Sequence, residues 1–191
     1  VPGENAVYSF QGKSGQVISV RASRVRSGSY LVLTRDAAPD RQIQAIWAPP
    51  PTGNLLVARL PADDTYFVTV DPAGANTETA TVGLYDVTEA VRADAAIGGP
   101  PVRLATSAPG QNAIINFEAQ AARTVNIRSR GLDGAYITLI SGAGDEVVSR
   151  RWLPAGGSLA LTIPAAGRFQ LRLDPEGSSP GSYELQLEAS Q

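Results

Sequence analysis

The two halves of this 191-residue chain repeat each other. Seven segments of the first half recur in the same order in the second half. They are Gly3-Glu4-Asn5-Ala6 with Gly110-Gln111-Asn112-Ala113, Tyr8-Ser9-Phe10 with Ile115-Asn116-Phe117, Val17-Ile18-Ser19-Val20-Arg21 with Thr124-Val125-Asn126-Ile127-Arg128, Gly28-Ser29-Tyr30-Leu31-Val32-Leu33 with Gly134-Ala135-Tyr136-Ile137-Thr138-Leu139, Trp47 with Trp152, Leu60-Pro61 with Ile163-Pro164, and Tyr66-Phe67-Val68-Thr69-Val70-Asp71-Pro72 with Phe169-Gln170-Leu171-Arg172-Leu173-Asp174-Pro175. The offset falls from 107 residues (Gly3 to Gly110) to 103 (Tyr66 to Phe169), so the second copy has slightly shorter loops. A duplicated module is therefore predicted, with one fold present twice.

Each copy has the pattern of short β-strands. Residues 17–20 and 31–33 are aliphatic and rich in β-branched side chains, and residues 66–70 combine alternation with good β-formers. Clusters of Gly, Pro, Asn and Asp interrupt these runs at the spacing expected of a sandwich or barrel. The sequence predicts an all-β protein made of two tandem antiparallel β-sandwich domains, of the jelly-roll or immunoglobulin-like kind.

The repeat also predicts the domain boundaries. We expect the first sandwich over residues 1–88, a linker over 89–101 with room for a short helical turn, and the second sandwich over 102–191. The second copy is preceded by an alternating stretch, residues 101–107, that resembles an added first strand, whereas the first copy is preceded by Val1 and Pro2. Because an unpaired sheet edge is a template for another chain, we expect a strand joint between subunits. Its candidate residues are Val7, Tyr8, Ser9, Phe10, Val102 and Leu104.

Composition excludes several kinds of chemistry. The chain has no Cys and no His, so it can form neither a disulfide nor a zinc-thiolate site, and it has no Ser-His-Asp triad. A formal net charge of -2 argues against a nucleic-acid partner, and no apolar run reaches the roughly 20 residues that span a bilayer. The chain has no Met and begins at Val1, from which we expect either a processed, exported protein or a segment of a longer one.

Several of these motifs resemble bacterial pre-peptidase C-terminal domains. They are the Gly-Gln-Asn-Ala turn at residues 110–113, the strand start Gly15-Gln16-Val17, and the closing strands that end in Asp71-Pro72 and Asp174-Pro175. The stretch from Ile97 to Ala113 resembles the joint between successive modules of secreted repeat proteins. The resemblance implies jelly-roll modules beside secreted enzymes or in surface arrays. Some members bind calcium, but this chain has no Asp-x-Asp-x-Asp cluster, and no cofactor is expected.

Matching aromatic residues are the candidates for a ligand surface. If Leu31 and Leu33 point into the core, Tyr30 points outward, and the same alternation applies to Tyr136. Exposed rings form stacking platforms for sugars, so Tyr30, Tyr136, Trp47 and Trp152 are candidate glycan contacts. The alternative for the two tryptophans is a place in the core.

The carboxylates Asp63 and Asp64 lie in the turn before the closing strand of the first copy. Either they serve the turn through local hydrogen bonds or they contribute to a calcium site. The corresponding turn of the second copy, residues 165–167, has no acidic residue, which favours the role in the turn.

These observations predict a non-catalytic extracellular structural or adhesive module. Its partners would be neighbouring copies in a surface array or filament, joined by β-strand contacts between subunits. The alternative is a carbohydrate-binding ancillary module of a secreted enzyme, with a polysaccharide partner. Both functions place the protein outside the cell, secreted or at the cell surface.

Overall fold

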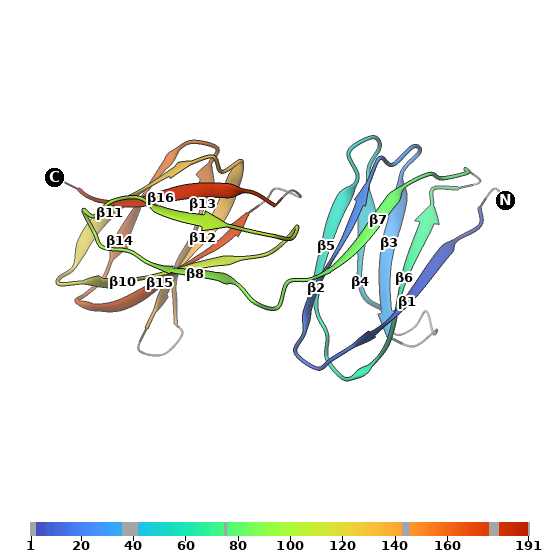
Figure 1. Ribbon diagram of the computed structural model, residues 1–191, viewed down its shortest axis with the longest axis horizontal. Helices are drawn as coiled ribbons and strands as arrows, with labels where there is room; N and C mark the ends of the chain where they lie inside the picture. Colours follow the sequence, from blue (N-terminus) through green and yellow to red (C-terminus); the bar gives the residue numbers. More distant parts are fainter. Residues whose placement is uncertain (1–2, 36–41, 75, 143–145, 176–179, 191) are drawn as a thin grey trace. The chain divides into compact units, whose positions relative to one another are not determined.

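The computed structural model describes residues 3–35, 42–74, 76–142, 146–175 and 180–190, and the regular structure of these residues consists of β-strands (Figure 1). The chain divides into two compact units, Val1–Thr88 and Glu89–Gln191. The described residues form four sheets, two in each unit, so the predicted all-β class with two sandwich domains is confirmed. The described part of the chain contains no helix of the length and apolar character needed to cross a membrane.

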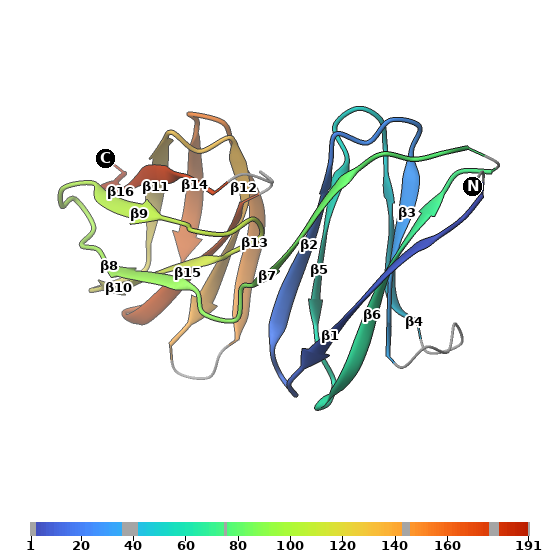
Figure 2. The same ribbon diagram turned by 45° about the vertical axis from the view of Figure 1, so that its right-hand side comes forward.

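The first module packs two sheets face to face (Figure 2). One sheet has the strand order β1-β6-β3-β4 and the other has the order β5-β2-β7. The strands are β1 (Ala6–Gly12), β2 (Val17–Ser23), β3 (Ser29–Arg35), β4 (Gln42–Ala48), β5 (Asn54–Arg59), β6 (Asp64–Pro72) and β7 (Thr81–Asp86).

Alternation along the strands builds the core of the first module. In β6, Tyr66, Val68 and Val70 are buried, and the residues between them are partly exposed. They pack with Leu31 and Leu33 of β3 against Ile18 and Val20 of the facing sheet. A period of two puts successive side chains on opposite faces, so one apolar face per sheet suffices to form the core.

The second module repeats this arrangement with two added strands. Its sheets have the orders β13-β12-β15-β10-β8 and β14-β11-β16-β9. The strands are β8 (Val91–Asp94), β9 (Val102–Ala105), β10 (Ala113–Ala119), β11 (Arg123–Arg130), β12 (Gly134–Ser141), β13 (Val147–Pro154), β14 (Ser158–Ile163), β15 (Gly167–Pro175) and β16 (Ser182–Ala189).

The duplication extends to strand register. Phe10 of β1 lies opposite Tyr66, and the matching Phe117 of β10 lies opposite Phe169. The two ring pairs have centroid separations of 5.6 and 5.7 Å, and both have an interplanar angle of 26°. The two modules can therefore be compared residue by residue.

The expected linker is the main correction to the sequence-based organisation. Within residues 89–101, Val91–Asp94 form β8, which pairs in parallel with β10 of the second module. Val91 and Ala93 pack against that module's core. The Ala-rich composition suggested a short helical turn, but pairing with an open strand edge outweighs a weak helix propensity. This parallel pair is also an exception to the antiparallel arrangement that we predicted.

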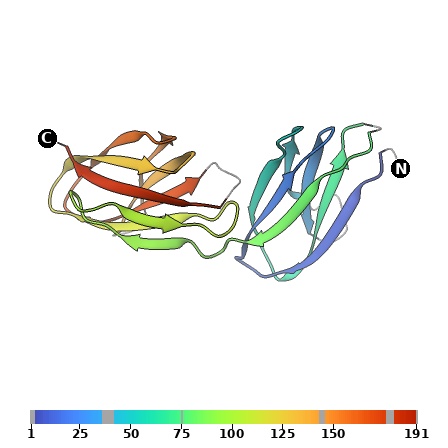
Figure 3. The same cartoon turned by 45° about the horizontal axis from the view of Figure 1, so that its top comes forward.

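The expected leading strand of the second module is present as β9, and it lies on the other sheet. β9 pairs antiparallel with β16 through Leu104 opposite Tyr183 and Val102 opposite Leu185. Strands β8 and β9 follow one another along the same side of the module (Figure 3). The second module thus has a strand on each sheet at this side. Among the described residues of the first module, β1 and β7 end their sheets here.

We predict that Leu104→Ala destabilises the second module by about 2–4 kcal/mol, because Leu104 is 1% exposed and its removal leaves a cavity between the sheets. Denaturant unfolding measures the loss of stability, and hydrogen exchange of the β16 amides, in a second experiment, shows whether the loss falls where β9 pairs. Leu84→Ala in β7 is the matched control, since Leu84 is 44% exposed, and it should change stability by less than about 0.5 kcal/mol. Equal effects of the two substitutions would contradict the assignment of β9 to the core.

Candidate functional site

The clearest difference between the modules lies at strand β1. Val7 and Tyr8 are 57% and 54% exposed, whereas their counterparts Ile114 and Ile115 in β10 are 8% and 0% exposed. Strand β8 covers the edge of β10, and among the described residues no strand lies on the corresponding edge of β1. β1 contains no charged residue and no proline, and its register with β6 is unbroken. Native sheet edges are commonly protected by charged residues, prolines or β-bulges, and β1 has none of these, so it is open to pairing.

The second sheet of the first module is open on the same side. Leu84 of β7 lies opposite Val20, as Leu187 of β16 lies opposite Ile127. Leu84 is 44% exposed and Leu187 is 2% exposed. β7 has 6 residues and β16 has 8, and the shortening falls at the start of the strand, where β9 pairs in the second module.

A groove of about 360 Å³ lies between these two edges of the first module. Ala6, Val70 and Pro72 form one wall, and Glu78 and Ala80 lie on the other. By register, Ala80 corresponds to Tyr183, a buried side chain opposite Leu104. The groove of the first module is thus lined by an alanine at the position where the second module has a buried tyrosine.

Glu78 ties the groove wall to the loop between β2 and β3. Its carboxylate accepts hydrogen bonds from the backbone N–H groups of Arg26 (2.6 Å) and Ser27 (3.0 Å) and from the Ser29 hydroxyl (3.2 Å). Burial acts to raise the pKa of Glu78, but these bonds and one from the Thr79 N–H together lower it below the usual value. These hydrogen bonds hold the segment around Glu78 against the loop between β2 and β3, although no strand pairs with that segment among the described residues.

The backbone of β1 presents the groups that a further strand needs. In the second module the carbonyl oxygens of Asn112 and Asn116 accept hydrogen bonds from Val91 and Ala95, both at 2.9 Å. In antiparallel pairing, alternate residues turn both backbone groups away from the partner strand. Because β1 has the same register on β6 as β10 has on β15, Asn5, Val7 and Ser9 turn their N–H and C=O groups outward.

The residues predicted for the strand joint fall into two groups. Val7, Tyr8, Ser9 and Phe10 lie together in the open strand β1. Val102 and Leu104 lie in β9 and pair with β16 of their own module, where the Leu104 side chain is buried. The sequence did not indicate that β8, β9 and the open groove occupy equivalent sides of the two modules. The one available signal was the replacement of Tyr183 by Ala80.

The paired aromatic residues lie on the outer sheet faces. Tyr30 and Tyr136 point outward, as their alternation predicted, and both are at least a third exposed. Trp47 and Trp152 are 36% and 42% exposed, so the alternative that placed the two tryptophans in the core was wrong. The ring centroids of Tyr30 and Trp47 are 5.0 Å apart, and the ring centroids of Tyr136 and Trp152 are 5.1 Å apart.

Glycines explain why both tryptophans stay on the surface. Gly28 and Gly134 have positive φ angles, and a Cβ atom at either position would lie 2.5 Å from the Cζ2 atom of Trp47 or Trp152, respectively. Each indole therefore covers a bare stretch of backbone. The cross-strand neighbours of Tyr30 and Tyr136 on the other side are Asp71 and Asp174, so a Trp–Tyr–Asp row recurs on both modules.

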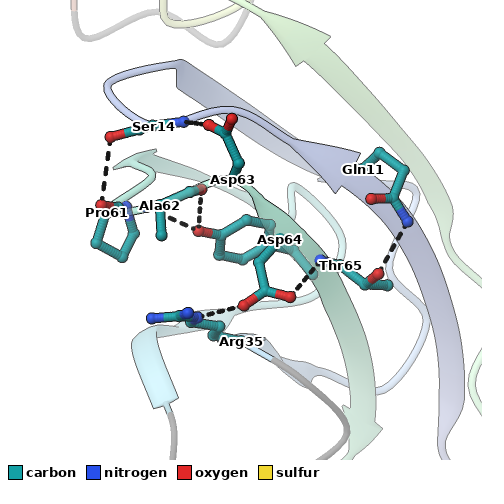
Figure 4. Close-up of polar contacts among 9 residues, drawn as sticks. Gln11, Ser14, Arg35, Pro61, Ala62, Asp63, Asp64 and Thr65 are labelled. Atoms are coloured by element: carbon teal, nitrogen blue, oxygen red, sulfur yellow. Dashed lines mark hydrogen bonds and ion pairs between the residues drawn. The ribbon is translucent and has the colours of Figure 1, made fainter.

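The turn carboxylates have protein partners (Figure 4). Asp63 accepts a hydrogen bond from the Ser14 N–H at 2.6 Å, and Asp64 forms an ion pair with Arg35 at 2.5 Å. Asp64 also accepts the Thr65 N–H at 2.8 Å. This geometry supports the role in the turn over the calcium site. No group of three or more acidic residues suited to a metal ion occurs within the described ranges.

Comparisons with known proteins give structural likenesses of low identity. No family model and no curated protein matches the sequence. The pre-peptidase C-terminal domain of a collagenase from Bacillus anthracis is 14% identical, with a TM-score of 0.39, covering 52% of this chain and 94% of that one. It belongs to the family that the sequence motifs resemble.

Two further likenesses come from other proteins. PliG, a periplasmic inhibitor of g-type lysozyme from Aeromonas hydrophila, is 16% identical with a TM-score of 0.34, covering 52% of this chain and 99% of that one. The CUB1-EGF-CUB2 region of human MASP-1/3 is 9% identical with a TM-score of 0.28, covering 98% of this chain and 94% of that one.

We predict that Gly134→Ala lowers the stability of the second module by about 1–3 kcal/mol, because the added Cβ displaces Trp152 and the φ angle of 124° disfavours any other residue. Near-ultraviolet circular dichroism should show the change at the indole, and thermal unfolding should give the loss. Gly181→Ala is the control, since nothing lies within 4 Å of its Cβ position. An unchanged indole signal in Gly134→Ala would contradict this packing.

Proposed function

We propose that this chain is a non-catalytic structural module of an extracellular assembly, in which a strand from a neighbouring chain adds to β1. One observation carries the proposal. The apolar strand β1 is exposed in the first module, while its counterpart β10 is covered and buried in the second. Burying apolar side chains is favourable at about 25 cal/mol per Å², and added backbone hydrogen bonds give the contact its register.

The non-catalytic part rests on chemistry that the chain does not contain. It has neither His nor Cys, which removes the commonest general base and the thiolate nucleophile. The carboxylates Asp63 and Asp64 are engaged by turn and ion-pair partners. The extracellular location rests on the resemblance of the motifs to modules of secreted proteins.

Val7→Pro tests the strand addition in the native assembly. Proline removes the outward N–H of Val7 and leaves the bonds between β1 and β6 in place, so the chain should fold but enter the assembly at least about tenfold less. Val7→Thr keeps the N–H and the β-branched shape and is the matched control. Electron microscopy of the assembly, with the bound fraction measured, gives the result. Normal incorporation of Val7→Pro would refute the function.

The Trp–Tyr–Asp row supports a second function, carbohydrate binding. Aromatic faces stack on sugar rings, and a neighbouring carboxylate accepts hydrogen bonds from hydroxyl groups. In the second module, Arg150 lies 4.4 Å from the Tyr136 ring centroid and 3.7 Å from Asp174, which adds a donor.

A polysaccharide pull-down with the full chain tests this second function. Tyr136→Ala should reduce retention about tenfold, because it removes the central residue of the row and one of its two aromatic rings. Thr138→Ala, two residues further along the same face of β12, is the control and should bind as the unaltered chain does. Equal retention of Tyr136→Ala and the unaltered chain would remove this row as a glycan site.

A further inference from the structure

We infer that the open side of the first module binds a two-strand segment of another polypeptide, with the chemistry of residues 91–105. One strand would pair in parallel with β1, and the other would pair antiparallel with the start of β7. This inference rests on the proposed function and specifies its partner. The second module supplies the argument, because its own residues 91–105 occupy the equivalent side.

The parallel strand follows from the shared register. β8 pairs with β10 through Val91 opposite Ala113 and Ala93 opposite Ile115. Ala6 and Tyr8 hold the corresponding places in β1, and Asn5, Val7 and Ser9 turn their backbone groups to the open edge. Asn116 donates a side-chain hydrogen bond to Asp94 at 3.0 Å, and Ser9, at the same place in β1, has a hydroxyl that can donate in the same way.

The antiparallel strand follows from the second sheet. β9 pairs with residues 182–185, which correspond to residues 79–82 of the first module. There, Ala80 leaves the groove of about 360 Å³ open beside the short strand β7. An apolar side chain at the position of Leu104 would cover this groove, as Leu104 lies in the core opposite Tyr183. The exposed Leu84 corresponds to Leu187, whose carbonyl accepts a hydrogen bond from the N–H of Gly98 between β8 and β9, so the connection between the two added strands would lie beside Leu84.

The two internal strands define the chemistry of the occupant. β8 reads Val-Arg-Ala-Asp and β9 reads Val-Arg-Leu-Ala, so both have apolar first and third residues and arginine between them. In β9 the third residue, Leu104, is buried while Arg103 is exposed. The first module thus selects an extended segment with apolar residues at alternate positions and charge on the outer face.

Self-pairing of β1 with β1 of a second copy fits the site less well. Such a pair would be antiparallel and would add one strand to one sheet. It would leave Leu84 exposed and the groove beside Ala80 open, because both belong to the β7 side. Only an occupant that contributes to both sheets buries what the second module buries with β8 and β9.

A synthetic peptide of residues 90–106, titrated into the full chain, tests the inference. Calorimetry should show one saturable site with a Kd below about 100 µM. Val7→Pro should weaken binding at least about tenfold and Val7→Thr less than about threefold, with unfolding temperatures of both variants close to that of the unaltered chain. A peptide carrying Leu104→Asp should also bind at least about tenfold more weakly, because it places a charge over the groove.

Three results would overturn the inference. They are the absence of peptide binding, binding that Val7→Pro leaves unchanged, and a peptide-independent dimer of the chain that Val7→Pro abolishes. The third result would make a second copy the occupant. If the peptide fails to bind while Val7→Pro still blocks entry into the native assembly, the named segment is wrong and the proposed function stands. If the peptide binds while Val7→Pro assembles normally, the proposed function fails and the peptide site remains.

Discussion

The covering of sheet edges is the constraint on which the rest of this structure depends. A two-layer sandwich buries one face of each sheet. The seam between its two sheets, at each side of the module where the edge strands lie, stays open unless further strands or side chains close it. In the second module, β8 and β9 close the seam, and Ile115 and Leu187 become buried. In the first module the same seam is open, and Tyr8 and Leu84 meet solvent. One fold thus has a closed and an open version within a single chain.

The duplication makes the open seam interpretable. An exposed apolar strand is by itself weak evidence of function, since much protein surface is apolar. Here the chain carries its own reference, with Phe10 on Tyr66 and Phe117 on Phe169 in nearly identical geometry. Compared with its counterpart Ile114 in the second module, Val7 is far more exposed, and this is a difference between two copies of the same fold. The groove is lined by Ala80, which stands where the other copy has the buried Tyr183.

The outer faces carry a second repeated feature with a structural cause of its own. Trp47 and Trp152 cover Gly28 and Gly134, whose positive φ angles turn the chain at the start of β3 and β12. The indoles are therefore required for packing whether or not a ligand binds there. The seam differs between the copies and the Trp–Tyr–Asp row does not, so the seam is the feature that distinguishes the first module from the second.

The sequence by itself determined the duplication, the all-β class and the outward direction of Tyr30 and Tyr136, because strand alternation and ordered repeats are local patterns. It also predicted that the first module has an unpaired sheet edge at the strand that is β1 in the structure. The tertiary structure decided the rest. Val91–Asp94 form a strand because they pair with the edge of β10. Leu104 is buried in the core because β9 pairs with β16. Such pairings depend on residues distant in the chain, and local pattern does not record them.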